Sequence, residues 1–548
     1  MKKWLVFLVA VFTIFVLAAC TANEDTGKET DNSKDKDKAD AAEETSDEKV
    51  LYLNNSEEPT SFNPAIGFDA VSWNALNNLM EGLTRLGEDH TPQAAIAEDW
   101  EVSEDGKTYT FHLREDANWS NGDPVIADDF VYAWQTLLDP ETGSSAAFLG
   151  YFIEGGEAFN SGKGSAEDLG LTAVDDKTFE VQLENPTGYF LHVVTNPAFF
   201  PVNKKVAEEN PDWHAEADSF VANGPFQLES WDHDSEMVMV KNEEYWDADA
   251  VNLDKVHWAM VNDTNTDYQM FQSGELDNAD IPPELSDELI DGDNVAIEEQ
   301  GGLEFYRFNV TEEPFTNKKI RKAFAMAANR QDITDFVVKN GVEPAFGFVS
   351  PGFINPSGGD FRDTNGDIVK FEPDEAKKLL EEGMKEEGYD ELPPVTLTYN
   401  TSDTNKGIAE ALQSMFSENL GVDVTLENTE WNVFLEDQMG LKHQLSRSSF
   451  LYDYADPINF LESFITDSSM NRTGWSNETY DKLIADIKAE ADEEKRWDLM
   501  YEAEALLAEE MPILPIRYYN QVELIRDGVT GLLRHPVGYL ELKHADVE

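Results

Sequence analysis

Segments in which apolar and polar residues alternate recur along the chain and are typical of half-buried β-strands. Residues 107–114, KTYTFHLR, show this alternation, which would place the apolar side chains on one face. Residues 226–231 and 236–242 predict two strands around an Asp/Ser turn. The same strand character is found in residues 50–53, 178–183, 396–399, 422–426 and 513–519.

Between these segments the apolar residues recur at helical spacing. Residues 127–138, ADDFVYAWQTLL, begin with two aspartates in the first turn, where the helix dipole favours negative charge. Strands and helices alternate throughout, so we predict an α/β architecture. The other predicted helices are 73–83, 320–328, 373–382, 408–420 and two amphipathic helices within 479–509.

The first twenty residues, MKKWLVFLVAVFTIFVLAAC, have the layout of a secretory signal peptide. A positive start precedes an apolar stretch that is short for a membrane span, and small residues precede Cys20. The pattern closely resembles the lipobox of bacterial lipoproteins. This implies that residues 1–20 are a lipoprotein signal peptide and that Cys20 is lipidated as the mature N-terminus. The alternative is an ordinary signal peptide with a chance cysteine.

Residues 21–49 contain no apolar side chain other than alanine. Such a segment cannot bury enough surface to offset the entropy lost on ordering, and we predict that it is disordered. It would form a flexible acidic tether with a reach of about 30 Å between the lipid anchor and a folded body.

Charge and composition narrow the functional classes. The 548 residues include 110 acidic and 40 basic side chains, for a net charge of −70. This charge would repel phosphate backbones, so nucleic acid is excluded as a partner, and we expect a strongly solvated surface. The length predicts two or three domains. A single cysteine excludes internal disulfides and a Cys-based zinc cluster.

Several motifs for catalysis or metal binding fail on inspection. The glycine-rich segment 156–165 has the wrong spacing for a P-loop, and no G-x-S-x-G or H-E-x-x-H sequence is present. Residues 361–372 partly resemble a calcium loop, but Phe361 stands where the first ligand must be an aspartate, so a plain turn is favoured over a calcium site. We predict no catalytic residue, no metal and no cofactor.

Longer segments resemble one known family. Residues 79–140, from LMEGLTRLGEDHTPQ to VYAWQTLLDP, are similar to the signature region of the family 5 extracellular solute-binding proteins, which include oligopeptide- and dipeptide-binding lipoproteins. Residues 221–246, SGELD at 273–277, 315–333 and YNTSD at 399–403 resemble further segments of the family in the same order.

The resemblance implies the class II periplasmic-binding-protein fold, in which two α/β lobes joined by a hinge close over a ligand. One lobe would carry an extra subdomain. The implied division is 50–80, 206–303 and 521–548 for lobe 1, 81–205 for the extra subdomain, and 304–520 for lobe 2.

The stretch FLYDYADP at 450–457 places Asp453 between two tyrosines. Its spacing from Arg447 resembles a motif of the peptide-binding members, which implies that Asp453 binds the α-ammonium of a peptide. Without the resemblance, an aspartate that caps a turn ahead of Pro457 is the simpler interpretation. The other implied contacts are backbone groups of Ser449 and Leu451, facing backbone of Phe68, Asp69 and Ala70, pocket walls from Trp431 and Phe450, and Arg447 either at the ligand or in a structural ion pair.

Basic residues that would bind the C-terminal carboxylate of a peptide are missing at two matching positions of this sequence. Some relatives have basic side chains that balance the peptide's carboxylate, whereas the matching positions here are Asn405 and Gln438, with Lys339 near a third. How the peptide C-terminus is held, and which length is preferred, therefore stay open.

The function that the resemblance implies is a monomeric, lipid-anchored receptor on the extracellular face of a bacterial membrane. It would bind oligopeptides and deliver them to the permease and ATPase subunits of an ABC importer, without catalysis of its own. The alternatives are a dipeptide, nickel-chelate or other small-solute receptor of the same family, and, from other classes, an extracellular hydrolase or an adhesin.

Overall fold

The computed structural model describes residues 48–466 and 468–548. The predicted signal peptide with Cys20, and nearly all of the predicted tether, lie outside this range. Within it, no helix is both long enough and apolar enough to cross a membrane.

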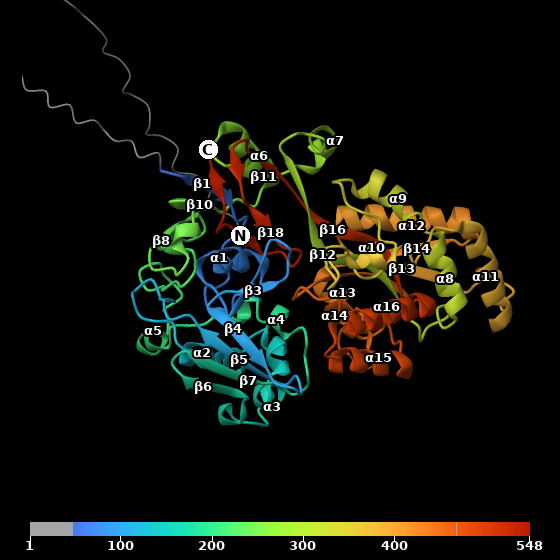
Figure 1. The fold of residues 1–548 in the computed structure, drawn as a ribbon. Helices are drawn as coiled ribbons and strands as arrows, with labels where there is room; N and C mark the ends of the chain where they lie inside the picture. Colours follow the sequence, from blue (N-terminus) through green and yellow to red (C-terminus); the bar gives the residue numbers. More distant parts are fainter. Residues whose placement is uncertain (1–47, 467) are drawn as a thin grey trace, which may run out of the picture. The chain divides into compact units, whose positions relative to one another are not determined.

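One four-stranded sheet brings together segments from both ends of the first 260 residues (Figure 1). Leu51, Leu53, Val256 and Trp258 are buried, which follows the two-residue period of paired strands. The first strand pairs parallel to its neighbour, and the other pairs are antiparallel. The order is β1 (Val50–Asn54), β10 (Lys255–Ala259), β9 (Glu236–Lys241) and β8 (Phe226–Asp232).

A second four-stranded sheet is antiparallel and is covered by α2 (Ala127–Leu138), whose bounds match the predicted helix. Phe130 and Trp134, one helical turn apart, face the sheet, and both contact the ring of Phe179. The strand order is β4 (Ala97–Val102), β5 (Thr108–Leu113), β7 (Thr178–Gln182) and β6 (Leu171–Asp175).

The third sheet has six strands in the order β11 (Asn278–Asp280), β16 (Ile513–Ile525), β12 (Val295–Phe308), β15 (Leu445–Leu451), β13 (Val395–Asn400) and β14 (Val424–Thr429). Aromatic residues cover both faces. Phe308 packs on Phe315, next to Phe324 of α8 (Lys318–Ala327), and Phe305 packs on Phe460 of α14 (Ile458–Leu461). The outer helices are α11 (Pro373–Glu387), α12 (Asp403–Leu420), α15 (Glu478–Ala489) and α16 (Glu493–Glu510).

The longest strands, β12 and β16, form a ribbon that is irregular at one point. Their register shifts between Gln300 and Leu303, beside Gly301 and Gly302. A Cβ at Gly302 would lie 2.9 Å from the backbone carbonyl oxygen of Phe450, which cannot move aside, so glycine is favoured there. A β-bulge of this kind bends and twists a strand pair. The boundary predicted at residues 303/304 falls at this bulge, and the division into lobes stays a prediction.

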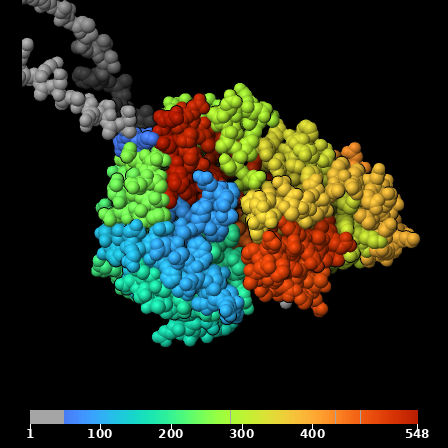
Figure 2. Space-filling model, in the orientation of Figure 1, coloured from blue at the N-terminus to red at the C-terminus, as the bar shows by residue number. Residues whose placement is uncertain are grey.

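Helix α1 (Ala70–Leu79) begins and ends earlier than the predicted helix 73–83. The Asp69 carboxylate accepts a hydrogen bond from the backbone N–H of Ser72 and so sets the start of the helix. The C-terminal segment returns to this helix, because the carbonyl of Leu540 accepts hydrogen bonds from Asn77 and Asn78. In Figure 2 the C-terminal residues accordingly lie among the N-terminal segments.

The remaining elements are short apart from α6 (Thr264–Ser273). The strands are β2 (Thr84–Leu86), β3 (Pro92–Ala94), β17 (Val529–Thr530), β18 (Leu533–Arg534), β19 (Leu540–Glu541) and β20 (Asp546–Val547). The helices are α3 (Gly156–Asn160), α4 (Phe190–Val193), α5 (Lys204–Glu209), α7 (Ser286–Leu289), α9 (Arg330–Ile333), α10 (Phe361–Asn365) and α13 (Trp431–Met439).

Candidate functional site

Strand β15 has one edge that is largely unpaired. It pairs with β12 along its whole length, but β13 pairs only with Leu445 and Ser446. The side chain of Gln438 donates to the carbonyl of Arg447, which identifies the residues whose backbone points to the free edge. Because backbone direction alternates along a strand, Ser449 and Leu451 point the same way. This edge can add one further strand, such as an extended peptide.

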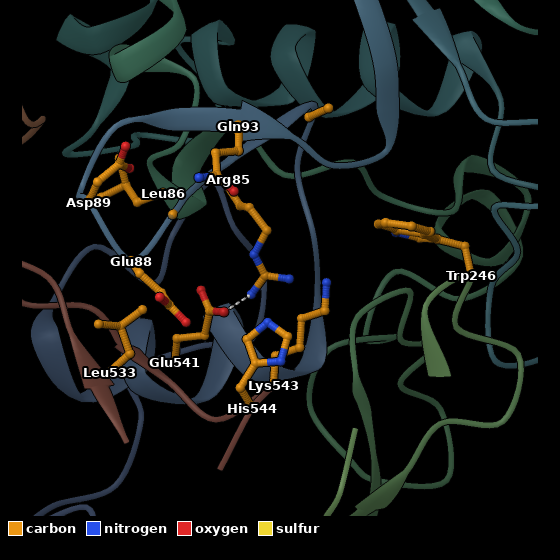
Figure 3. Close-up of a pocket in the computed structure, with 12 residues that line it drawn as sticks. Arg85, Leu86, Glu88, Asp89, Gln93, Trp246, Leu533, Glu541, Lys543 and His544 are labelled. Carbon is orange, nitrogen blue, oxygen red and sulfur yellow. Dashed lines mark ion pairs between the residues drawn. The ribbon is translucent and has the colours of Figure 1, made fainter. Parts of the chain in front are cut away.

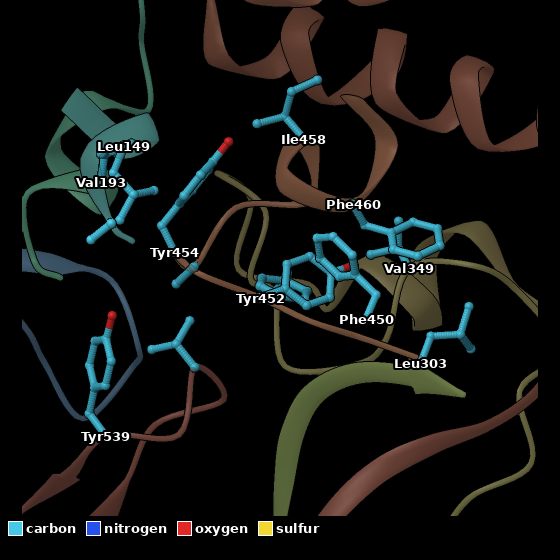
Figure 4. Close-up of a cluster of buried hydrophobic side chains, with 14 of the residues drawn as sticks. Leu149, Val193, Leu303, Val349, Phe450, Tyr452, Tyr454, Ile458, Phe460 and Tyr539 are labelled. Atoms are coloured by element: carbon cyan, nitrogen blue, oxygen red, sulfur yellow. The ribbon is translucent and has the colours of Figure 1, made fainter. Parts of the chain in front are cut away.

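The side chains along this edge differ in exposure. Leu451 is 51% exposed, whereas Phe450 is 7% exposed and packs against Tyr452 and Phe460 in the aromatic core (Figure 4). The side chain of Phe450 thus points to the face covered by α14, and its role as a wall of a ligand pocket stays a prediction. The side chain of Trp431 lies outside the described part of the structure.

Asp453 follows the free edge, and its backbone is held from several segments. Its carbonyl accepts hydrogen bonds from Asn196 at 2.9 Å and from the hydroxyl of Tyr539 at 3.3 Å. Its N–H donates to Asn459 at 2.8 Å. The side chain is only partly buried, and no described cationic group lies within 4 Å of its carboxylate. This carboxylate is therefore suitably placed for a cationic group of a ligand.

The electrostatic setting of Asp453 is unusual for an aspartate. Burial raises the pKa of its carboxyl to about 6, a hydrogen bond with the Asn459 side chain lowers it in part, and the charge of Glu462 adds to the rise. A nearby ammonium group would favour the ionised form and lower this pKa again. The site thus favours a ligand that brings a positive charge.

The cap of the turn at Pro457 is provided by a different acid. The carboxylate of Asp456 accepts from the N–H of Ile458 and forms a two-point ion pair with Arg496. Both Asp456 and Arg496 are buried. The residue that caps the turn at Pro457 is therefore Asp456 and not Asp453.

Arg447 belongs to a buried ion-pair cluster. Its Nε donates to Glu304 at 2.8 Å, and Arg517 donates to the other oxygen of Glu304 at 2.6 Å. The terminal nitrogens of Arg447 reach Ser449 and Tyr519. Burial alone would raise the pKa of the Glu304 carboxyl, but the charges of Arg517 and Arg447 outweigh it and hold this pKa below its ordinary value. Arg447 is thus a structural ion-pair partner in this structure, next to the free edge.

The segment expected to face β15 is partly occupied by helix α1. The carboxylate of Asp69 caps the helix, and its carbonyl accepts from the N–H of Trp73. Ala70 is the first helical residue, and the N–H groups of a first turn have no partner within the helix. Phe68 packs edge-on against Trp73, which in turn contacts Tyr539. The segment is thereby linked to the Asp453 loop through Tyr539.

The three positions considered for a peptide carboxylate have partners of their own. Asn405 binds Asn400, and Gln438 binds Ser446 and the Arg447 carbonyl. Lys339 forms an ion pair with Asp287. In the described part of the chain, none of these side chains offers an unpaired positive charge.

A cavity of about 560 Å³ shares no lining residue with the Asp453 loop. Figure 3 shows Arg85 and Glu541 paired on its wall, and Lys543 is paired with Asp247. Arg85 and Lys543 are therefore each paired with a carboxylate of the protein. In the loop considered for calcium, Phe361 is buried and begins α10, and the described residues contain no group of three or more His, Cys, Asp or Glu side chains that could hold a metal.

Comparison with known proteins gives one decisive match. The model of the bacterial extracellular solute-binding proteins, family 5, matches residues 91–472, more than half of the chain. The chain belongs to this family. Members are extracellular solute-binding proteins by that description, and the two-lobe fold expected from the sequence is the fold of the family's solved structures.

Two curated members of the family are similar over almost their whole length. The dipeptide-binding protein DppE of Bacillus subtilis is 61% identical over 532 residues, which cover 97% of this chain and 96% of the relative. The oligopeptide-binding protein OppA of the same organism is 38% identical over 558 residues, with 99% of each chain covered.

Solved structures of family members have the same fold. The unliganded open form of the murein tripeptide-binding protein MppA aligns with a TM-score of 0.80 at 30% identity, covering 91% of this chain and 97% of that one. OppA of Listeria monocytogenes bound to peptide aligns with a TM-score of 0.71 at 32% identity, covering 91% and 99%.

Sequence reasoning missed five residues around the site. Asn196 and Tyr539 bind the Asp453 carbonyl from positions 257 and 86 residues away, and no local pattern could indicate them. Asn459 lies two residues after FLYDYADP, and its short polar side chain next to Pro457 was an available signal. Glu304 and Arg517 are charged residues within apolar strands, a combination that predicts a buried ion pair.

Proposed function

We propose that this protein is a receptor that binds peptides between its two lobes and delivers them to an ABC importer, with no catalytic activity of its own. The observation that supports this most directly is the free edge of β15, which is followed by Asp453. An edge strand can bind the backbone that all peptides share, and a carboxylate without a cationic partner can bind their N-terminus. The peptide-binding names of similar proteins agree with this.

In this proposal Asp453 binds the α-ammonium, and Ser449 and Leu451 exchange backbone hydrogen bonds with the ligand. Arg447, fixed by Glu304, shapes the adjoining floor of the site. Lobe closure over the ligand would exclude water, and an ion pair in such an environment is much stronger than in solution. The lobes are those predicted from the sequence, with lobe 2 at 304–520.

Mass spectrometry of ligands that co-purify with the protein from cells grown in peptide-rich medium tests the function. We expect peptides of mixed sequence, because backbone pairing does not select side chains. Since DppE, at 61% identity, is named for dipeptides, the length distribution decides between a dipeptide and an oligopeptide receptor. A single sugar or a metal chelate in place of peptides would contradict the proposal.

The lipid anchor is a separate part of the proposal, and it depends on Cys20. Cys20→Ser should prevent lipidation and release the protein into the medium, because a thioether-linked lipid requires the cysteine sulfur. Peptide affinity of the released protein should match that of the wild type, since the site lies within residues 48–548. A detergent-partition assay measures the distribution, and a variant that stays in the detergent phase would contradict this role of Cys20.

A further inference from the structure

Residues 187–199 belong to the predicted extra subdomain, yet they contact the loop that carries Asp453. The side-chain amide of Asn196 donates to the carbonyl of Asp453 at 2.9 Å. In the same segment, the ring of Tyr189 stacks on the ring of Tyr454, with centroids 5.7 Å apart and planes at 11°. Asn196, Tyr189 and Tyr454 are all buried. The Asp453 loop therefore packs on a segment that lies 257 residues earlier in the chain.

This segment is held in place by the extra subdomain itself. The carbonyl of Phe199 accepts a hydrogen bond from the indole N–H of Trp134 at 2.8 Å, and the carbonyl of Thr187 accepts from the hydroxyl of Tyr109 at 2.7 Å. Trp134 lies on α2 and Tyr109 on β5, so both anchors belong to regular elements. All four groups are groups of the protein, and the segment offers the loop a surface whose position does not depend on a ligand.

Asn196 connects this surface to the loop with the two ends of its side-chain amide. Its oxygen accepts from the N–H of Ala198 at 2.9 Å and so caps the short helical turn Pro197–Phe199. Its NH₂ group donates to the carbonyl of Asp453. One buried side chain thus links the backbone of the subdomain to the backbone of the ammonium site.

The carbonyl of Asp453 has a second donor, the hydroxyl of Tyr539, at the longer distance of 3.3 Å. A nitrogen donor at 2.9 Å is close to the optimum for a hydrogen bond, whereas 3.3 Å is beyond the usual range for a hydroxyl donor. Asn196 is therefore the stronger of the two groups that hold this carbonyl.

The position of the Asp453 backbone decides where its carboxylate can lie. A hydrogen bond between an ammonium and a carboxylate has an N···O distance of about 2.7–2.9 Å, and a buried ion pair repays the cost of desolvation only when its geometry is good. A loop that is free to shift would therefore bind a peptide ammonium less well. A peptide without this charge would lose nothing by the same shift.

We propose that Asn196 is a positioning residue for the selection of peptides with a free N-terminus, and that the extra subdomain in this way supports the ammonium site of lobe 2. The inference rests on the proposed function, because it requires Asp453 to bind the α-ammonium. Asn196 acts through the backbone of Asp453 and does not touch the peptide.

Asn196→Ser removes the donor and keeps the cap. Serine is as good an N-cap as asparagine, so its hydroxyl can still accept from the N–H of Ala198, but its side chain is too short to reach the Asp453 carbonyl as well. The affinity for trialanine should fall about tenfold, as expected when a buried acceptor loses its better partner. The affinity for N-acetyl-trialanine should not fall, because this peptide has no ammonium for Asp453 to bind.

Two further variants complete the design. Asn196→Thr should give the same result if the serine variant does not fold, because its hydroxyl can cap the turn and its branched side chain suits the extended backbone ahead of Pro197. Asn203→Ser is the matched control: Asn203 is also buried and caps α5 of the same subdomain by accepting from Val206, but it lies outside residues 187–199. Its affinities for both peptides should equal those of the wild type.

The measurement is isothermal titration calorimetry with trialanine at pH 7, with competition titrations for the weaker N-acetyl-trialanine. The deciding quantity is the ratio of the two affinities, which should fall about tenfold in Asn196→Ser. An equal loss for both peptides would overturn the inference, since a general defect of the structure has no reason to distinguish a charged from an acetylated N-terminus.

The failure of the inference can be told apart from the failure of the proposed function. If the wild type binds neither trialanine nor any other short peptide, the proposed function fails and the inference fails with it. If the wild type prefers trialanine to its acetylated form and Asn196→Ser keeps the same preference, only the role of Asn196 is refuted.

Discussion

Asp453→Asn is expected to weaken the binding of a peptide with a free N-terminus by roughly two to four orders of magnitude. The substitution leaves the peptide's ammonium next to a neutral amide inside the closed site. Breaking one side of a buried ion pair costs about 3–5 kcal/mol, which corresponds to this loss. Calorimetry with the wild type and the variant measures it directly.

N-acetylation of the peptide should have a similar effect on the wild type, because the Asp453 carboxylate then lacks its cation. The two changes together should cost much less than their sum, since each removes the same interaction. This double-mutant cycle is the control for a general loss of structure in Asp453→Asn. Equal affinity of the wild type for free and acetylated peptides would refute the role of Asp453.

Glu304→Gln is expected to lower the free energy of unfolding by about 3–5 kcal/mol at pH 7, because Arg447 and Arg517 would lose the charge that compensates them in a buried place. The pKa of Glu304 is lower in the folded protein than in the unfolded chain. Its stabilising contribution is therefore fully present above about pH 4.3, the ordinary pKa, and is lost as the pH falls through the folded value.

Urea unfolding at pH 7 and at progressively lower pH measures this difference. The gap between wild type and Glu304→Gln should narrow in acid, where Glu304 of the wild type becomes protonated as well. Glu418→Gln is the matched control, because it makes the same chemical change on the exposed surface of α12 and should alter stability by less than about 0.5 kcal/mol. A variant as stable as the wild type at pH 7 would show that the cluster is not an important source of stability.

Elements with a regular apolar pattern could be predicted from the sequence, and the element whose pattern is interrupted could not. Helix α2 was predicted with its bounds because its apolar face and its first-turn aspartates agree. Strand β12 was missed although it has 14 residues. Gly301 and Gly302 interrupt it, and the buried charges of Glu304 and Arg307 hide the expected apolar pattern.

Only part of the candidate site could be predicted from the sequence, because many of its residues come from distant segments. Local sequence, together with the family resemblance, indicated Asp453 and the strand before it. Asn196 and Tyr539, which bind the Asp453 carbonyl, come from distant segments of the chain. A single sequence does not indicate which distant residues are in contact. The direction in which Phe450 points likewise depends on which face of β15 is covered, and that is determined by α14 packing on the sheet.

The return of the C-terminal segment to α1 has a consequence for how the protein is made. Asn78 and its partner Leu540 are separated by 462 residues. At a synthesis rate of about 5–20 residues per second, the second partner is produced roughly 25–90 s after the first. Tyr539, which binds the Asp453 carbonyl, belongs to the same late segment. The contacts between α1 and the C-terminal segment can therefore form only once the last residues of the chain are present, and the same late segment supplies the Tyr539 hydroxyl to the Asp453 carbonyl.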